Sequence, residues 1–137
     1  MPDRQELYFS TASLTGRLLM AAIFVISGCA KVASYDATAS LMAAHGLPPE
    51  LLPIVILTEL GGALALILGW RVRWVALALA GYCVLSALAF HLDLGNPDQA
   101  FNFLKNLAMA GGFLQLYAFG SGRFALDRSS RSTVHGA

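Results

Sequence analysis

The stretch that decides the fold is LLPIVILTELGGALALILGW, residues 51–70, in which Glu59 is the single charged residue. A helix of that length, at about 1.5 Å rise per residue, matches the hydrocarbon thickness of a bilayer, about 30 Å. Glu59 then lies about 12 Å from the Leu51 end. A charge at that depth costs about 2.5–3.5 kcal/mol on insertion scales and normally faces other helices or a cavity. The stretch therefore predicts a membrane-spanning helix with an inward-facing carboxylate.

Small residues in the same stretch predict close packing against another helix. Gly61, Ala65 and Gly69 recur at four-residue spacing. In lipid no hydrophobic force drives helices together, so small side chains favour association by letting backbones approach closely. We therefore expect the face that carries these three residues to contact a neighbouring helix.

The composition of the whole chain is typical of a polytopic membrane protein. Its 137 residues are 57% hydrophobic and only 12% charged, which is too apolar for an ordinary soluble domain. The net charge of +1 gives no reason to expect a nucleic-acid partner. Cys29 and Cys83 lack the spacing of a zinc site or a redox dithiol, and we expect them to be packing residues rather than a disulfide.

Four apolar stretches predict an all-α fold, an antiparallel bundle of four transmembrane helices joined by short connections. The spans cover about residues 14–33, 51–70, 74–91 and 101–119, within a transmembrane domain of residues 14–120. Residues 1–13 form a polar lead-in and residues 121–137 a polar tail. Between the first two spans, residues 36–44 predict a short interfacial helix, because the surrounding segment is too polar and too interrupted to span.

The first span permits two interpretations. Ile26-Ser27-Gly28-Cys29 follows an apolar run and resembles a bacterial lipoprotein cleavage site. The residues before it are nearly neutral, whereas a signal peptide should begin with a clearly basic region, and three further spans follow. We therefore favour an uncleaved first helix and expect the mature protein to retain Met1 or Pro2.

The distribution of the cations predicts the orientation. Trp70-Arg71-Val72-Arg73-Trp74 is typical of a tight turn at a cytoplasmic headgroup layer. With alternating spans, seven of the nine cations fall on the side of that turn, and two fall on the other. The first group is Arg4, Arg17, Arg71, Arg73, Arg123, Arg128 and Arg131, and the second is Lys31 and Lys105. The positive-inside rule then places both termini in the cytoplasm.

Polar residues from four different helices converge in the outer half of this predicted arrangement. They are Lys31, Glu59, His91, Lys105 and Asn106. We expect Glu59 to pair with one of the two lysines. Two lysines and one glutamate, with the histidine neutral, give a net positive pocket that suits an anion or a carbonyl-bearing ligand such as a quinone headgroup. Each residue also has a simpler role open to it, as a snorkelling helix end or as a polar contact between helices.

Arg17 is a second polar position. At 100° per residue it lies on the same face of the first span as Phe24, Gly28 and Lys31, near the other end of the helix. The sequence offers no closed set of metal ligands, no phosphate-binding glycine loop and no nucleophile with a base, so we expect no metal site.

These features together resemble the DoxX family of small bacterial inner-membrane proteins, over nearly all of residues 14–127. The resemblance rests on Arg17, Ser27-Gly28 with Lys31, Glu59 with Gly61-Gly62, Gly69, His91, Lys105-Asn106 with Gly111-Gly112, and Gly120-Ser121-Gly122 leading to Leu126-Asp127. It implies an inner-membrane location and a link to redox chemistry. The family takes its name from a subunit of a membrane thiosulfate:quinone oxidoreductase, and other relatives resemble partners in thiol-redox complexes.

From the resemblance and the polar cluster we expect a membrane subunit of a quinone- or sulfur/thiol-linked redox complex. The chain carries no cofactor motif or dithiol of its own, so as an oxidoreductase subunit it would act in the bilayer with a redox partner protein or as a homo-oligomer. Two alternatives stay open, a small permease or exporter that uses the same pocket and a structural membrane anchor for a partner protein. Four helices without an evident inverted repeat disfavour the permease.

Overall fold

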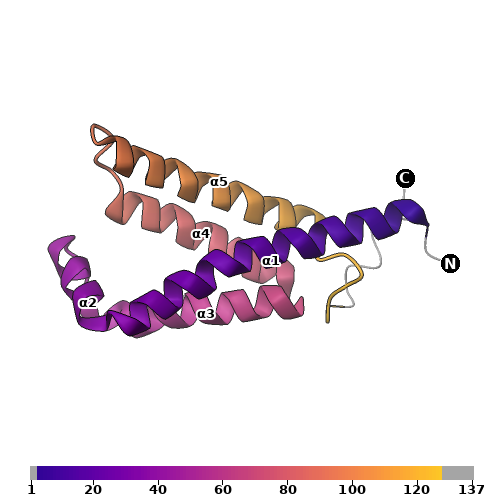
Figure 1. Ribbon diagram of the computed structural model, residues 1–137, viewed down its shortest axis with the longest axis horizontal. Coiled ribbons are helices and arrows are strands. Elements are labelled where there is room, and N and C mark those ends of the chain that lie inside the picture. Colours follow the sequence, from indigo (N-terminus) through magenta and orange to yellow (C-terminus); the bar gives the residue numbers. More distant parts are fainter. Residues whose placement is uncertain (1–2, 128–137) are drawn as a thin grey trace.

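The computed structural model describes residues 3–127, and its regular structure is helical throughout. The elements are α1 (Arg4–Ala33), α2 (Tyr35–Ala44), the short 3-10 helix η1 (Pro49–Leu51), α3 (Leu52–Leu68), α4 (Val72–Phe90) and α5 (Pro97–Phe119). The four long helices run side by side, and α2 lies at one end of them (Figure 1). The predicted all-α class is therefore confirmed for this part of the chain.

Three helices in residues 3–127 are long and apolar enough to cross a membrane. They are α1, the continuous stretch Pro49–Leu68 and α4. Many of their large apolar side chains are exposed, such as those of Leu19 (70% exposed), Leu57 (72%) and Leu85 (68%), which suits contact with lipid. With its 23 residues α5 is long enough to span, but Asn102, Lys105 and other polar residues lower its mean hydropathy. A fourth span through α5 and cytoplasmic termini stay predictions.

The helices begin and end near the expected residues, with one difference at the N-terminus. α1 begins at Arg4, so most of the expected lead-in, residues 1–13, continues the first helix. Residues 4–13 contain neither glycine nor proline, and Glu6 lies in the first turn, where a negative charge favours a helix. α2 occupies the segment predicted as a short helix. Met1, Pro2, Arg128 and Arg131, which entered the predictions above, lie outside the described residues.

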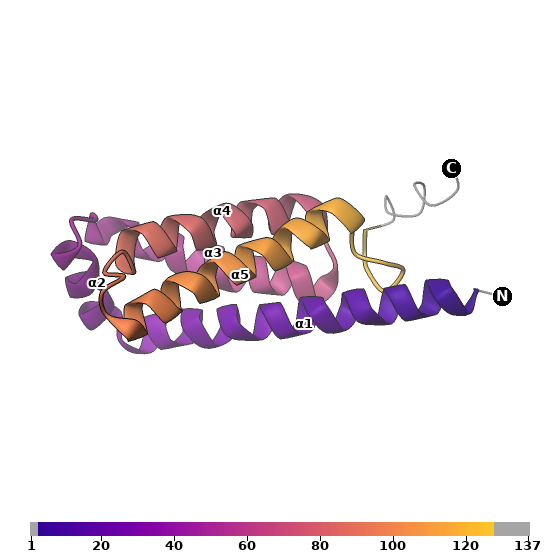
Figure 2. The same cartoon turned by 90° about the horizontal axis from the view of Figure 1, so that it is seen from above.

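The long helices pack as two antiparallel pairs, α1 with α3 and α4 with α5, and a smaller contact between α3 and α4 joins the pairs. Figure 2 shows α1 extending past the others at its N-terminal end, away from α2. Phe24 of α1 lies at the centre, where its ring contacts those of Tyr82 and Phe113 at centroid distances of 6.0 and 5.6 Å. The buried face of α1 also carries Arg17 and Gly28, as the sequence predicted.

The close helix contacts use different glycines from those expected. Gly61 is exposed, and a Cβ added there would meet no atom within 4 Å. Gly28 instead lies against Leu60 of α3, and Gly62 lies against Leu79 of α4, where an added Cβ would come within 2.6 and 2.9 Å of those side chains. The expectation for Gly61 was wrong because the carboxylate of α3 decides which face turns inward. Gly61, two residues further on, lies about 160° away from that face.

Candidate functional site

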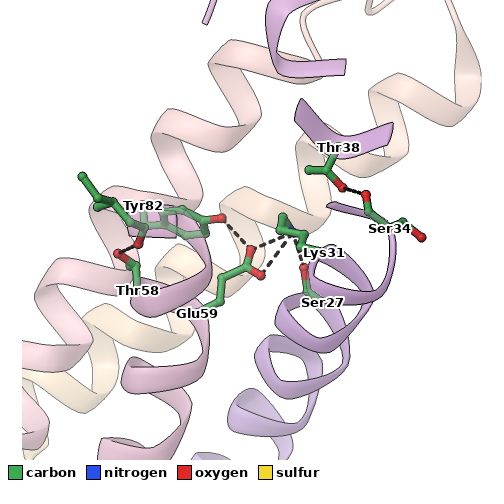
Figure 3. Close-up of polar contacts among 8 residues, drawn as sticks. Ser27, Lys31, Ser34, Thr38, Thr58, Glu59 and Tyr82 are labelled. Atoms are coloured by element: carbon green, nitrogen blue, oxygen red, sulfur yellow. Dashed lines mark hydrogen bonds and ion pairs between the residues drawn. The ribbon is translucent and has the colours of Figure 1, made fainter. Parts of the chain in front are cut away.

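Glu59 is buried, with 3% of its surface exposed, where α3 faces α1 and α4. Its Oε1 and Oε2 lie 2.9 and 3.1 Å from Nζ of Lys31 on α1. The hydroxyl of Tyr82 on α4 donates to Oε1 at 2.5 Å, and Lys31 also donates to Oγ of Ser27 at 2.6 Å (Figure 3). We call these four residues the Glu59 cluster. Two neighbouring helices, α1 and α4, thus supply the partners that a carboxylate inside a membrane requires.

The Glu59 cluster is only partly enclosed. The side chain of Glu59 is 4% exposed, whereas that of Lys31 is 24% exposed. Charge-assisted hydrogen bonds of this length are stronger than neutral ones and offset part of the cost of removing the two charges from water. Lys31 also lines the cavity described next.

A cavity of about 280 Å³ adjoins the cluster and is bounded by four helices. α1 contributes Ile23, Phe24, Ser27 and Lys31; α3 contributes Glu59; α4 and its end contribute Tyr82, Ser86 and His91; and α5 contributes Asn102, Lys105, Asn106 and Met109. All five residues of the predicted polar constellation line this cavity. The structure therefore brings them together, and their role in binding a ligand stays a prediction.

The wall formed by α5 has a regular spacing. Asn102, Lys105, Asn106 and Met109 stand at positions i, i+3, i+4 and i+7, which share one face of a helix. The side-chain amide of Asn106 donates to the carbonyl of Asn102 at 3.0 Å. The ammonium of Lys105 lies 5.5 Å from the centre of the Phe101 ring, and the ion pair of Glu59 is made by the other lysine. The wall therefore lines the cavity with two amide side chains and the side chain of Lys105.

His91 lies at the C-terminal end of α4, where it connects this helix to α5. Its Nδ1 is 2.7 Å from Oε1 of Gln99. The ring is half-buried and borders the cavity at the end nearer α2. The cavity is lined by two lysines, Lys31 and Lys105, and by one carboxylate, Glu59. With His91 neutral, its lining therefore carries one excess positive charge.

Arg17 lies apart from this cavity, fully buried near the opposite end of α1. Its Nη1 donates to the carbonyl of Leu66 at 2.8 Å, and its Nη2 donates to the carbonyl of Phe124. The Leu66 carbonyl belongs to the last turn of α3, at the negative end of the helix dipole. Arg17 therefore caps α3 and holds residues 120–127, the C-terminal segment.

The C-terminal segment covers the turn between α3 and α4. The backbone N–H groups of Leu126 and Asp127 donate to the carbonyls of Leu68 and Gly69 at 3.1 and 2.9 Å. The carboxylate of Asp127 accepts from the backbone N–H of Val72 at 3.1 Å, which caps the start of α4. Gly69 has a φ of 71°, and a Cβ there would lie 2.4 Å from Cβ of Ala125. A glycine is therefore required at this point.

Sequence reasoning missed several residues of the site. Tyr82 and Ser86 stand four residues apart in an otherwise apolar span, and that spacing could have placed them on one inward face. Asn102 precedes Asn106 by one turn and could have been found in the same way. Cys29 is exposed and Cys83 is buried, and neither forms a disulfide.

Comparison with known proteins identifies the family of the chain. The DoxX family model matches residues 12–92, which is more than half of the chain. The chain belongs to the DoxX family. The matched region contains Lys31, Glu59 and Tyr82 and ends just after His91, before α5.

Two proteins of Escherichia coli strain K12 are similar over most of their length. The inner membrane protein YqjF is 40% identical over 115 residues, which are 84% of this chain and 88% of YqjF. The inner membrane protein YphA is 32% identical over 123 residues, with 84% of this chain and 87% of YphA covered. No solved structure matches the chain. With its three apolar helices, this DoxX-family chain is a multi-pass protein of the inner membrane.

Proposed function

We propose that this DoxX-family chain is the membrane subunit of a quinone- or sulfur/thiol-linked redox complex, and that the cavity beside the Glu59 cluster is its ligand site. The observation that carries the proposal is the accessibility of a buried ion pair. An ion pair that served only to join helices would be expected to be enclosed, because open space beside it contributes no packing. Lys31 instead borders a cavity.

The proposal includes α5 as a fourth span. Three of the polar residues that lower its hydropathy, Asn102, Lys105 and Asn106, line the cavity. Polar residues on an inward face are compatible with a span, because they avoid lipid. Four spans put both termini on one side, and the arginine-rich turn after α3 favours the cytoplasmic side for them. The Glu59 cluster then belongs to the outer half of the membrane.

The size and chemistry of the cavity favour a small ligand rich in acceptor oxygens. Its volume of about 280 Å³ is at the lower end of the range for ligand pockets, about 300–1,000 Å³, so a headgroup or a small anion fits better than a large molecule. Quinone carbonyls and sulfur oxyanions both accept hydrogen bonds from groups such as the ammonium of Lys105 and the amide of Asn106. Electrons would pass to or from a partner protein that carries the redox group.

The direct test is analysis of what co-purifies with the protein in mild detergent. We expect the parent protein to retain a quinone or a sulfur compound, identified by mass spectrometry after extraction, together with a redox partner protein. Glu59→Gln removes the charge at nearly constant volume and should lose most of the bound small molecule while remaining folded. Glu50→Gln makes the same chemical change at an exposed carboxylate outside the cavity and should behave like the parent.

Two outcomes would contradict the proposal. If Glu59→Gln retains the same small molecules as the parent and has no cellular phenotype, the Glu59 cluster is a structural contact only. If a partner protein co-purifies equally with both forms and neither contains a small molecule, the chain is an anchor for that partner.

A further inference from the structure

The exposed part of the cavity lining comes from α1 and α5. Of the residues that line it, Ile23 on α1 and Lys105 on α5 are the exposed ones, and the others are buried or half-buried. These two helices belong to different pairs, since α1 packs mainly on α3 and α5 mainly on α4. The exposed edge of the cavity therefore lies along the junction between the two helix pairs.

The depth of this opening corresponds to the hydrocarbon region of a membrane. Ile23 precedes the end of α1 at Ala33 by ten residues, and Lys105 follows the start of α5 at Pro97 by eight, so they lie about 15 and 12 Å from the nearer helix ends. Exposed apolar side chains lie nearby on the two helices, such as Leu19 (70%) on α1 and Leu104 (61%) on α5. The wall that contains the opening is therefore suited to contact with acyl chains.

The nearer end of the helices is covered by other elements. Met42 of α2 is buried, with 4% of its surface exposed. The ring of His45, which follows α2, lies 5.0 Å from that of Phe90 at the end of α4. α2 and the turn between α4 and α5 thus lie together at this end of the bundle (Figure 1).

We propose that the ligand enters the cavity sideways from the bilayer, between α1 and α5. It is therefore a membrane-soluble molecule of the quinone class, with an oxygen-bearing headgroup and an apolar tail, rather than a water-soluble sulfur oxyanion. This rests on the proposed function, which leaves both classes open. The headgroup occupies the space beside the Glu59 cluster and Asn106, and the tail leaves past Ile23 into the lipid.

The test measures binding of a radiolabelled ubiquinone with a decyl tail to the full chain in lipid nanodiscs, with radiolabelled thiosulfate measured in parallel. Ile23→Trp places an indole at the opening and should weaken quinone binding by about tenfold or more, because the added volume fills the path of the tail. Ile26→Trp adds the same group one turn further along α1, outside the cavity lining, and should leave binding within about twofold of the parent. Circular dichroism and thermal melting establish that both variants are folded.

A second form of the test does not depend on the folding of a tryptophan variant. In a background without Cys29 and Cys83, Ile23→Cys is purified in its folded state and then modified with a bulky maleimide. Modification should reduce quinone binding, whereas the same treatment of an Ile26→Cys protein should not.

The outcomes separate this inference from the proposed function. If quinone binding depends on Glu59, as measured with Glu59→Gln, but is equal in the two tryptophan variants and the two modified proteins, the sideways path is wrong and the ligand site stands. If thiosulfate binds in a manner that depends on Glu59 and the quinone does not bind, the ligand class is wrong. If neither binds, or binding is indifferent to Glu59→Gln, the proposed ligand site fails as well.

Discussion

The ion pair between Lys31 and Glu59 allows a quantitative prediction about stability. Glu59→Ala removes a carboxylate that accepts hydrogen bonds from Lys31 and Tyr82. Loss of one partner from a fully buried pair costs about 3–5 kcal/mol, because the remaining charge is left uncompensated. Lys31 is 24% exposed, so the pair is not fully buried and we expect a smaller cost of about 2–3 kcal/mol for this variant.

A double-mutant cycle isolates the part of this cost that belongs to the pair. Lys31→Met removes the positive charge and keeps the apolar length of the side chain. The double variant leaves neither charge stranded, so it should be less destabilised than the sum of the single changes by about 1–3 kcal/mol. The matched cycle with Lys105→Met should show less than about 0.5 kcal/mol of coupling, because Lys105 lies by the Phe101 ring and the other lysine holds the carboxylate.

The assay is reversible unfolding of the purified protein in mixed micelles, followed by circular dichroism as the fraction of denaturing detergent rises. The four proteins of each cycle are measured under one set of conditions. Additive effects for Lys31 and Glu59 would refute the reasoning, because they would mean that the two charges do not interact in the membrane-like state. Coupling to Lys105 in place of Lys31 would show that the charge pairing of the site is different.

Three further predictions follow from single contacts. Tyr82→Phe removes one hydrogen bond to the buried carboxylate and should cost about 1.5–3 kcal/mol in the same unfolding assay; an unchanged stability would mean that the bond is absent. Gly69→Ala should destabilise the protein by about 1–3 kcal/mol, because a left-handed φ and a close neighbour both oppose the new methyl group, whereas Gly61→Ala should be tolerated; equal effects would contradict this packing. In a cysteine-free background, Gly95→Cys should react with a membrane-impermeant maleimide on intact cells and Arg123→Cys should not; the reverse pattern would overturn the predicted orientation.

Much of the helical arrangement could be predicted from the sequence because the strongest signals were local. A long apolar run with one charge predicts a span and also its inward face, since exposure of Glu59 to lipid is the most costly alternative. The spacing of Arg17, Phe24 and Gly28 predicted the buried face of α1 for the same reason. The N-terminal ten residues of α1 could not be predicted from hydropathy, because their helical conformation depends on propensity and not on an apolar face.

The details of the site depend on distances across helices, which a periodic pattern does not contain. From the sequence, either Lys31 or Lys105 could be the partner of Glu59. In the structure the partner is Lys31, because the rotation of α1 turns its side chain toward α3. The error about Gly61 has the same origin, because a spacing of small residues identifies a stripe on one helix but not the neighbour that meets it. The position of Glu59 supplies the missing information. Because Glu59 faces the other helices, Gly61, two residues further on, faces away from them.

The two ends of the molecule differ in what their polar groups contact, and this difference connects the fold to the proposed activity. Near Arg17, polar side chains form hydrogen bonds with backbone groups: Arg17 donates to α3, and Asp127 accepts from the start of α4. These contacts, with the backbone hydrogen bonds of the C-terminal segment, fix the ends of the helices. Around Glu59, the polar side chains come from four helices and border open space. A closed end can hold the two helix pairs in register while the junction between α1 and α5 stays lightly packed near the cavity. Such an arrangement would permit the proposed ligand to enter between the helix pairs without unfolding either pair, because only the contact between α1 and α5 has to open.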